Sequence, residues 1–189
     1  MISNFFLLGD RTYLNNAIVT ADILSVVADI FGDTIDFNIK FKKPFNSQAE
    51  LKFSTEPLDG HTVGSFLTKL TKFYFSYTPV DVGLPTKIID PDEVNYFNLI
   101  WSITDAGRGI TQECFENEFG LMSSTDKVIF ALAEIPDTSI INNAIKNKYK
   151  PEITISKAVH LGNRRFKYSV LLDDKFFSYR YCSVKEFNI

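Results

Sequence analysis

Residues 12–31 read TYLNNAIVTADILSVVADIF and contain the longest apolar run of the chain, residues 18–31. Their polar members are spaced by seven, three and four residues, which places them on one narrow stripe of a helix; they are Asn15, Asp22, Ser25 and Asp29. A helix that is apolar over the rest of its circumference has to be surrounded by protein. Gly32 follows the last apolar residue, as is typical of a helix end. The segment therefore predicts a long helix at the centre of the fold.

The composition predicts one compact domain over residues 1–189. Of these residues 45% are apolar, and 20 Lys+Arg against 23 Asp+Glu give a net charge of −3. The apolar content excludes a disordered chain, and the slightly acidic balance lacks the basic footprint of a nucleic-acid binder. Residues 78–91 hold three prolines and a glycine and form the one plausible internal boundary. A subdivision into residues 1–90 and 91–189 therefore stays open.

Two His and two Cys leave little material for a metal centre, so we expect no metal and no cofactor. Cys114 and Cys182 lack the CxxC spacing of a metal or redox site, and we expect buried free thiols. The N-terminus has no basic region and only a four-residue apolar run, unlike a signal peptide. The apolar run 18–31 is interrupted by polar residues, so it does not predict a membrane span. The expected location is cytoplasmic.

Alternating residues predict strands after the central helix. Residues 35–41 and 48–54 alternate apolar and polar side chains, and residues 43–47 between them supply turn chemistry, which predicts a hairpin. Residues 59–62 read as a turn into a short helix, with Val63, Phe66, Leu67 and Leu70 on one face. Residues 73–77 are expected to be a strand.

The second half is expected to begin with a strand over residues 96–103, a turn over 104–109 and a helix over 110–119 that Gly120 ends. A strand over 128–133 precedes a helix capped at Asp137 or Thr138. Strands over 153–159, 166–172 and 176–184 close the chain, the last two joined in a tight hairpin at residues 173–174. About eight strands and three or four helices predict an α+β fold. Residues 9–11 and 105–108 are similar polar turns before a helix, which leaves a duplicated unit and two ordinary joints both open.

A buried helix entered from the polar turn GDRTYLNN (residues 9–16) and followed by strand residues FNIKFKKPF (37–45) resembles the hot-dog fold. The resemblance covers about a quarter of the chain, and the run 151–187 is compatible with the last strands of that family. It implies an antiparallel sheet wrapped around the long helix. It also implies an acyl thioester on coenzyme A or an acyl carrier protein as ligand, and a homodimer, unless two halves of this chain already form the pair.

The same resemblance implies a catalytic centre on the helix. Dehydratases of the family pair a His with a carboxylate, and no His lies near this helix, which argues against dehydration. The thioesterase branch implies a carboxylate, here Asp22, as base, and a helix start near Asn15 and Asn16 that polarises the thioester carbonyl. Loss of hydration makes a carboxylate a better base, and free N–H groups at a helix start stabilise negative charge. Alternatively, Asp22 marks a solvated edge or pairs with a Lys of the sheet, and the asparagines are ordinary capping residues.

Two further groups are candidates for substrate binding. Asp10, Arg11 and Tyr13 precede the helix, although Asp10 and Arg11 also fit a cap and a surface ion pair. Arg164 and Arg165, with Lys167 and Arg180, form the one local basic cluster, which would bind a phosphate of the carrier or line a solvated hairpin edge.

The segments 73–77 and 176–181 place aromatic side chains on both faces of a strand. One face packs in the core, and the other calls for a second layer, a ligand or a partner chain. Two further functions therefore stay open beside the acyl-thioester one: a non-catalytic carrier of a small apolar ligand, and an interaction module whose aromatic strands pair with another protein.

Overall fold

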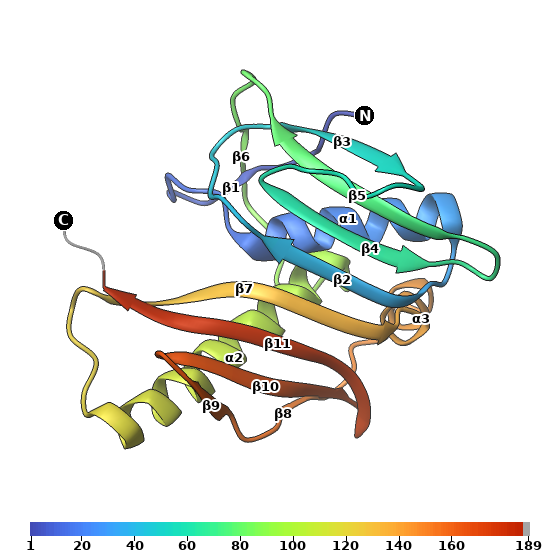
Figure 1. The fold of residues 1–189 in the computed structure, drawn as a ribbon. Coiled ribbons are helices and arrows are strands. Elements are labelled where there is room, and N and C mark those ends of the chain that lie inside the picture. Colours follow the sequence, from blue (N-terminus) through green and yellow to red (C-terminus); the bar gives the residue numbers. More distant parts are fainter. Residues whose placement is uncertain (187–189) are drawn as a thin grey trace.

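A computed structural model describes residues 1–186 (Figure 1). Three helices and eleven strands occur in this range: β1 Leu7–Leu8, α1 Asn16–Phe31, β2 Ile35–Phe41, β3 Ala49–Ser54, β4 Thr62–Leu67, β5 Lys72–Pro79, β6 Thr86–Lys87, α2 Tyr96–Phe119, β7 Asp126–Asp137, α3 Ser139–Lys146, β8 Ile153–Ile155, β9 Val159–Gly162, β10 Arg165–Leu172 and β11 Lys175–Glu186. Phe187, the end of one expected run, lies outside the described residues.

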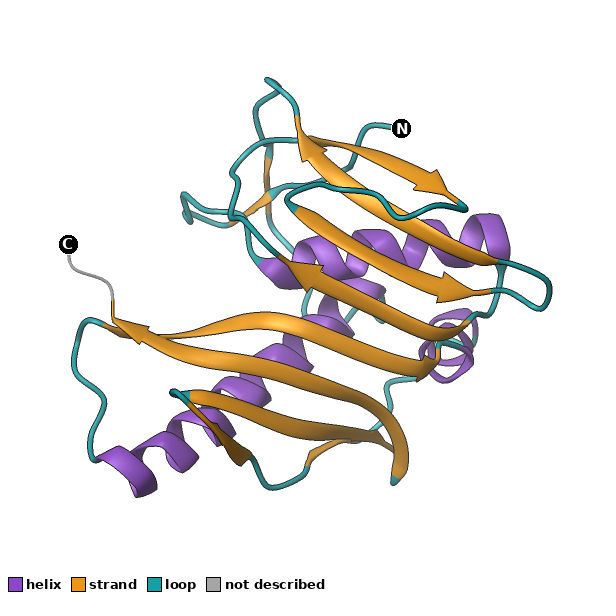
Figure 2. Cartoon of the chain, viewed as in Figure 1, coloured by secondary structure: helices purple, strands orange, loops and turns teal. Residues whose placement is uncertain are grey.

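One antiparallel sheet runs through the whole molecule in the order β3-β5-β4-β2-β7-β11-β10-β8, with β9 paired to β10. Strands β2 and β7 join the two halves, in a register that runs from Ile35 opposite Asp137 to Lys40 opposite Leu132. Helices α1 and α2 lie on the same side of this sheet and contact each other (Figure 2). Helix α1 packs behind β2–β5, and α2 packs behind β7–β11 (Figure 1). The α+β class and an antiparallel sheet packed against the long helix α1 are confirmed.

Helix α1 begins and ends where its capping residues place it. The Asn15 side chain accepts a hydrogen bond from the Ala17 N–H at 2.8 Å, so the helix starts at Asn16 rather than at Thr12. Gly32, with a φ of 74°, donates its N–H to the Ala28 carbonyl and ends the helix as predicted.

Much of the phenylalanine content is gathered around α1. The ring of Phe31 lies 4.8–5.4 Å from those of three sheet residues, Phe53, Phe66 and Phe73. Aromatic pairs at such distances gain energy beyond the area that they bury. The inward face of β5 thus packs in the core, as the sequence predicts for one face of residues 73–77.

The expected strand 96–103 and turn 104–109 are wrong, because residues 96–119 form the single helix α2. Its start is capped by Asn95, which accepts from the Asn98 N–H at 2.7 Å, and Gly120 ends it as predicted. The glycine that suggested a turn is needed for packing: a Cβ at Gly107 would lie 2.0 Å from the Tyr168 hydroxyl. The similarity between residues 9–11 and 105–108 therefore does not reflect two equivalent turns.

Two expectations for the first half are also wrong. Residues 62–67 form strand β4 instead of a short helix, and Gly64 lets it pass so close to its neighbours that a Cβ there would meet the Asn38 carbonyl at 2.1 Å. Residues 35–54 do contain two strands, but they do not form a hairpin. Strand β2 pairs with β4 and β7, while β3 pairs with β5. Local alternation identifies a strand without identifying its partner.

The hairpin of β10 and β11 is confirmed, with Asp173 and Asp174 at φ values of 49° and 60°. Two residues with positive φ match the right-handed twist of the strands that they join. The expected strand 153–159 is shorter, Ile153–Ile155. The N-cap of α3 is Thr138, whose side chain makes no capping bond, and the carboxylate of the preceding Asp137 accepts from the Ser139 N–H at 2.8 Å.

Candidate active site

The start of α1 is fixed against strand β7. Asn15 is buried and uses its side-chain oxygen as the helix cap, while Asn16 donates its amide to the Phe130 carbonyl at 3.1 Å. No acidic residue lies in the first turn, so the positive end of the helix dipole is not neutralised locally.

Asp22 lies on the same helix under strand β5 and the N-terminal segment. One carboxylate oxygen accepts from the Tyr77 hydroxyl at 2.5 Å, and the backbone N–H of Asn4 donates to the same side chain. Burial raises the pKa of Asp22, and the two hydrogen bonds offset part of that increase. Burial and the neighbouring Asp22 carboxylate hold the pKa of Tyr77 well above its ordinary value. Asp22 thus pairs with a tyrosine rather than with a lysine of the sheet.

Asn15 and Asp22 are seven residues apart, so they share one face of α1 and lie about 10 Å apart along its axis. One small group does not contact both. A ligand that reaches both the helix start and Asp22 therefore has to be extended along the helix.

The entry loop is tied to α2. Arg11 donates to the Tyr13 hydroxyl at 3.1 Å and its guanidinium lies 4.8 Å from the centre of the Trp101 ring. Arg108 of α2 lies 5.9 Å from the same ring. Asp10 is exposed, and none of the ion pairs among residues 1–186 joins it to Arg11.

The basic cluster expected at residues 164–180 does not exist as one surface. Arg164 pairs with Asp126 at 2.7 Å, and Arg165 donates to the Gly162 carbonyl. Lys167 lies over the Tyr179 and Tyr181 rings, at 3.9 and 5.3 Å, and Arg180 points into the core. Alternating strand positions face opposite sides, which separates the four cations.

The arginine pair is also distant from the start of α1. Asp126, the partner of Arg164, precedes Phe130, the partner of Asn16, by four residues of β7. Four strand residues span about 13 Å. The structure therefore brings Asn15, Asn16 and Asp22 onto one helix and leaves Arg164 and Arg165 elsewhere.

Strand register brings together Tyr168, which the sequence did not single out, and Arg180, which it placed only in the basic cluster. Tyr168 and Arg180 face each other across β10 and β11, and both are buried beside Thr104 and Gly107 of α2. Their positions in the sequence could have identified them, because each strand alternates apolar and polar residues and both Tyr168 and Arg180 stand where an inward-facing apolar residue is expected. Tyr77, the partner of Asp22, was expected only as a strand residue.

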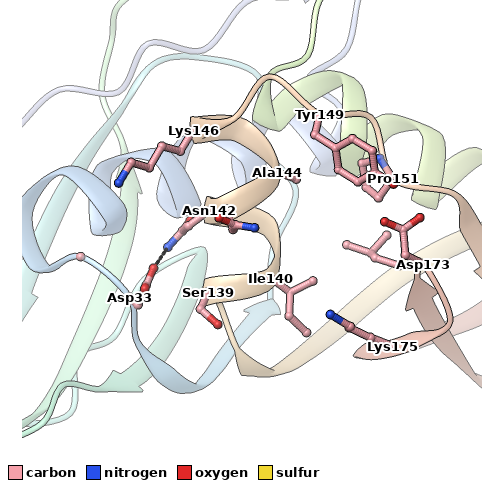
Figure 3. Close-up of a pocket in the computed structure, with 13 residues that line it drawn as sticks. Asp33, Ser139, Ile140, Asn142, Ala144, Lys146, Tyr149, Pro151, Asp173 and Lys175 are labelled. Atoms are coloured by element: carbon pink, nitrogen blue, oxygen red, sulfur yellow. Dashed lines mark hydrogen bonds between the residues drawn. The ribbon is translucent and has the colours of Figure 1, made fainter.

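A separate groove of about 570 Å³ lies between α3 and the turn of β10 and β11 (Figure 3). Its polar lining includes Asp33, Asn142, Lys146, Tyr149, Asp173 and Lys175, and none of the predicted site residues borders it. Asn142 donates to Asp33 at 2.9 Å, and the Asp173 carboxylate accepts from the Glu152 N–H at 2.9 Å, so several of these groups already have partners in the protein.

The described residues contain no group of three His, Cys, Asp or Glu side chains placed to hold a metal ion. Both cysteines are free, Cys182 buried and Cys114 partly so. Among residues 1–186, no helix combines the length and the hydropathy needed to cross a membrane.

No protein-family model matches the sequence, and a search of curated proteins finds no relative. Among solved structures, the chain is similar to an acyl-ACP thioesterase from Bacteroides thetaiotaomicron, with a TM-score of 0.45 and 7% identity over 97% of this chain and 98% of that one. It is also similar to a conserved protein of unknown function with a hot-dog fold from Alicyclobacillus acidocaldarius, with a TM-score of 0.35 and 7% identity over 94% and 89% of the two chains. Neither likeness is close enough to assign an activity.

Proposed function

We propose that this chain binds and hydrolyses or transfers an acyl thioester carried on coenzyme A or an acyl carrier protein. The observation that carries the proposal is the environment of Asp22: a partly buried carboxylate on the largely buried helix α1, held by the Tyr77 hydroxyl. A helix of this kind is the catalytic element that the hot-dog resemblance implies.

In hydrolysis, Asp22 takes a proton from a water molecule, whose oxygen forms a bond to the thioester carbon. The C–S bond then breaks with its electron pair on sulfur, and Asp22 returns the proton to that sulfur, so that a carboxylic acid and a free thiol leave. A base whose pKa has moved towards neutral is better matched to this step than an ordinary carboxylate. Tyr77 holds the carboxylate in place by donating to one of its oxygens.

The test replaces Asp22 by Asn and measures turnover of a panel of acyl thioesters. Loss of a general base typically costs about a hundredfold or more in rate, so Asp22→Asn should lower kcat by at least that factor. Asp29→Asn is the matched control, since Asp29 lies on the same polar stripe but is exposed. Unchanged turnover in Asp22→Asn would remove the catalytic role.

A second candidate is binding without catalysis. It is favoured by the separation of about 10 Å between the helix start and Asp22, because a carbonyl held at Asn15 or Asn16 is then out of reach of the base. Mass spectrometry of protein purified without harsh solvents discriminates between the two: a carrier retains its ligand, and an enzyme does not.

The remaining expectations are part of the same proposal. The ligand is expected in the cytoplasm, with no nucleic acid and no membrane as partner. Arg11 and Tyr13, with Asp10 beside them, are proposed to contact the carrier portion of the substrate at the helix entry. Homodimerisation remains a prediction, to be measured by hydrodynamic size over a range of concentrations.

A further inference from the structure

Arg180 is a buried cation with incomplete hydrogen bonding. Its side chain is 3% exposed and donates from Nη1 to the Thr104 hydroxyl at 3.2 Å. Its Nε is buried and makes no hydrogen bond within residues 1–186, and none of the ion pairs in that range includes it. The guanidinium lies 4.9 Å from the Phe130 ring, which compensates for little of the lost hydration.

Tyr168 stands directly opposite Arg180 in the register of β10 and β11. Its side chain is 1% exposed, and its hydroxyl also makes no hydrogen bond to the part of the chain that the structure describes. Side chains opposite each other on one face are about 5 Å apart at Cβ. Two buried donors without acceptors thus lie side by side.

Further positive charge lies around this pair. The charges of both Arg180 and Arg108 act on the Tyr168 hydroxyl, and Arg108 is 39% exposed. The start of α1 is also near, because Asn16 binds the carbonyl of Phe130, the residue whose ring contacts Arg180. Arg108 pairs with Asp105 at 3.6 Å, so the cation of this region that has no carboxylate partner within residues 1–186 is Arg180 in the core.

Proteins rarely leave such groups uncompensated. Buried charges are normally paired, and a buried donor without a partner calls for a specific explanation, such as a bound ion or ligand. A planar guanidinium fork matches the two oxygens of a carboxylate, and a tyrosine hydroxyl supplies a further donor. One cation next to neutral donors suits a monoanion better than a phosphate dianion.

We propose that Arg180 and Tyr168 bind a carboxylate of the ligand. This proposal rests on the proposed function. If the ligand is an acyl thioester, its acyl group carries a carboxylate at the end remote from the thioester. The substrate class is then a dicarboxylic acyl thioester rather than a simple fatty acyl thioester.

The test measures dissociation constants by calorimetry for glutaryl-pantetheine and pentanoyl-pantetheine, which differ in one terminal carboxylate, and for free glutarate and inorganic phosphate. The wild type should bind the glutaryl compound at least about tenfold more tightly, as expected for a charge-assisted hydrogen bond. Arg180→Met should remove this preference and glutarate binding, and Tyr168→Phe should weaken both several-fold. Lys185→Met is the matched control, an exposed cation of the same strand.

Equal affinity for the two thioesters in the wild type, or a preference that survives in Arg180→Met, would overturn the proposal. Phosphate binding as tight as glutarate binding would overturn the choice of a carboxylate. Should Arg180→Met not fold, an unchanged preference in Tyr168→Phe has the same force. Glutarate binding that depends on Arg180, without binding of either thioester, supports this site and contradicts the proposed function. Equal binding of both thioesters supports the proposed function and contradicts this carboxylate site.

Discussion

Asp22 makes the folded chain bind a proton more tightly than the unfolded chain does, because burial raises its pKa. Stability should therefore fall as the pH rises from the ordinary carboxyl value of 3.8 through the raised one. Asp22→Asn removes this titration, so the free energy of unfolding of the variant should rise relative to that of the wild type as the pH increases above 3.8. Urea denaturation at each pH measures it, with the exposed Asp29→Asn as control. A difference that is constant with pH would contradict the prediction.

Gly107 and Gly109 offer a matched pair on one helix. A Cβ at Gly107 would lie 2.0 Å from the Tyr168 hydroxyl, whereas one at Gly109 meets nothing within 4 Å. Gly107→Ala should destabilise the protein by about 2 kcal/mol through overpacking. Gly109→Ala should stabilise it by about 1 kcal/mol, since alanine favours a helix. Chemical denaturation tests both, and equal effects would contradict the close contact.

At this scale the sequence predicts part of the candidate site. The polar stripe singles out Asp22 because helical spacing is a local property. Tyr77 and Arg180 acquire their roles from the strand or helix beside them, which residue type does not reveal. The prediction fails at the basic cluster for the same reason, because four cations close in sequence divide between two faces of the sheet.

Among the elements, the turn between β10 and β11 allows a direct test. Asp174 has a φ of 60°, a region that favours glycine, and Asp174→Gly should stabilise the protein by about 0.5–1 kcal/mol. Asp173 has a similar φ, but its carboxylate accepts from the Glu152 N–H at 2.9 Å. Asp173→Gly should therefore give no net stabilisation, because the gain from glycine at a positive φ is offset by the lost hydrogen bond. Thermal unfolding of the two variants checks this, and equal stabilisation would argue against the hydrogen bond from Glu152 to Asp173.

The elements predicted well are those with strong local signals. Helix α1 has caps at both ends and an apolar surface, and the β10 and β11 strands alternate regularly around a two-residue turn. The sequence predicts a strand, a turn and a short helix where the structure has α2, because Gly107, Arg108 and Gly109 resemble a turn. In the structure Gly107 instead makes room for Tyr168, a strand residue about 60 positions later. Strand β4 resembled a helix because its apolar residues also fit helical spacing.

Across the whole molecule, the pairing of β2 with β7 decides how the halves relate. It connects a strand before residue 90 to one after it, and α1 contacts α2 on the same side of the sheet. Each half has one long helix packed against antiparallel strands, and the two helices contact each other. Such a long-range pairing leaves no local mark in the sequence.

The shared sheet leads to a prediction about cooperativity. If residues 1–189 unfold as one domain, a change far from α2 must shift the unfolding of α2 as well. Leu51 lies in β3 at the opposite edge of the sheet and is 3% exposed, so Leu51→Ala should cost about 3 kcal/mol. The only tryptophan, Trp101, lies in α2 and reports its unfolding by fluorescence. Leu51→Ala should move the fluorescence and circular dichroism transitions together to lower denaturant, while the exposed Lys52→Ala leaves both in place. A fluorescence transition that does not move would establish residues 1–90 and 91–189 as separate folding units.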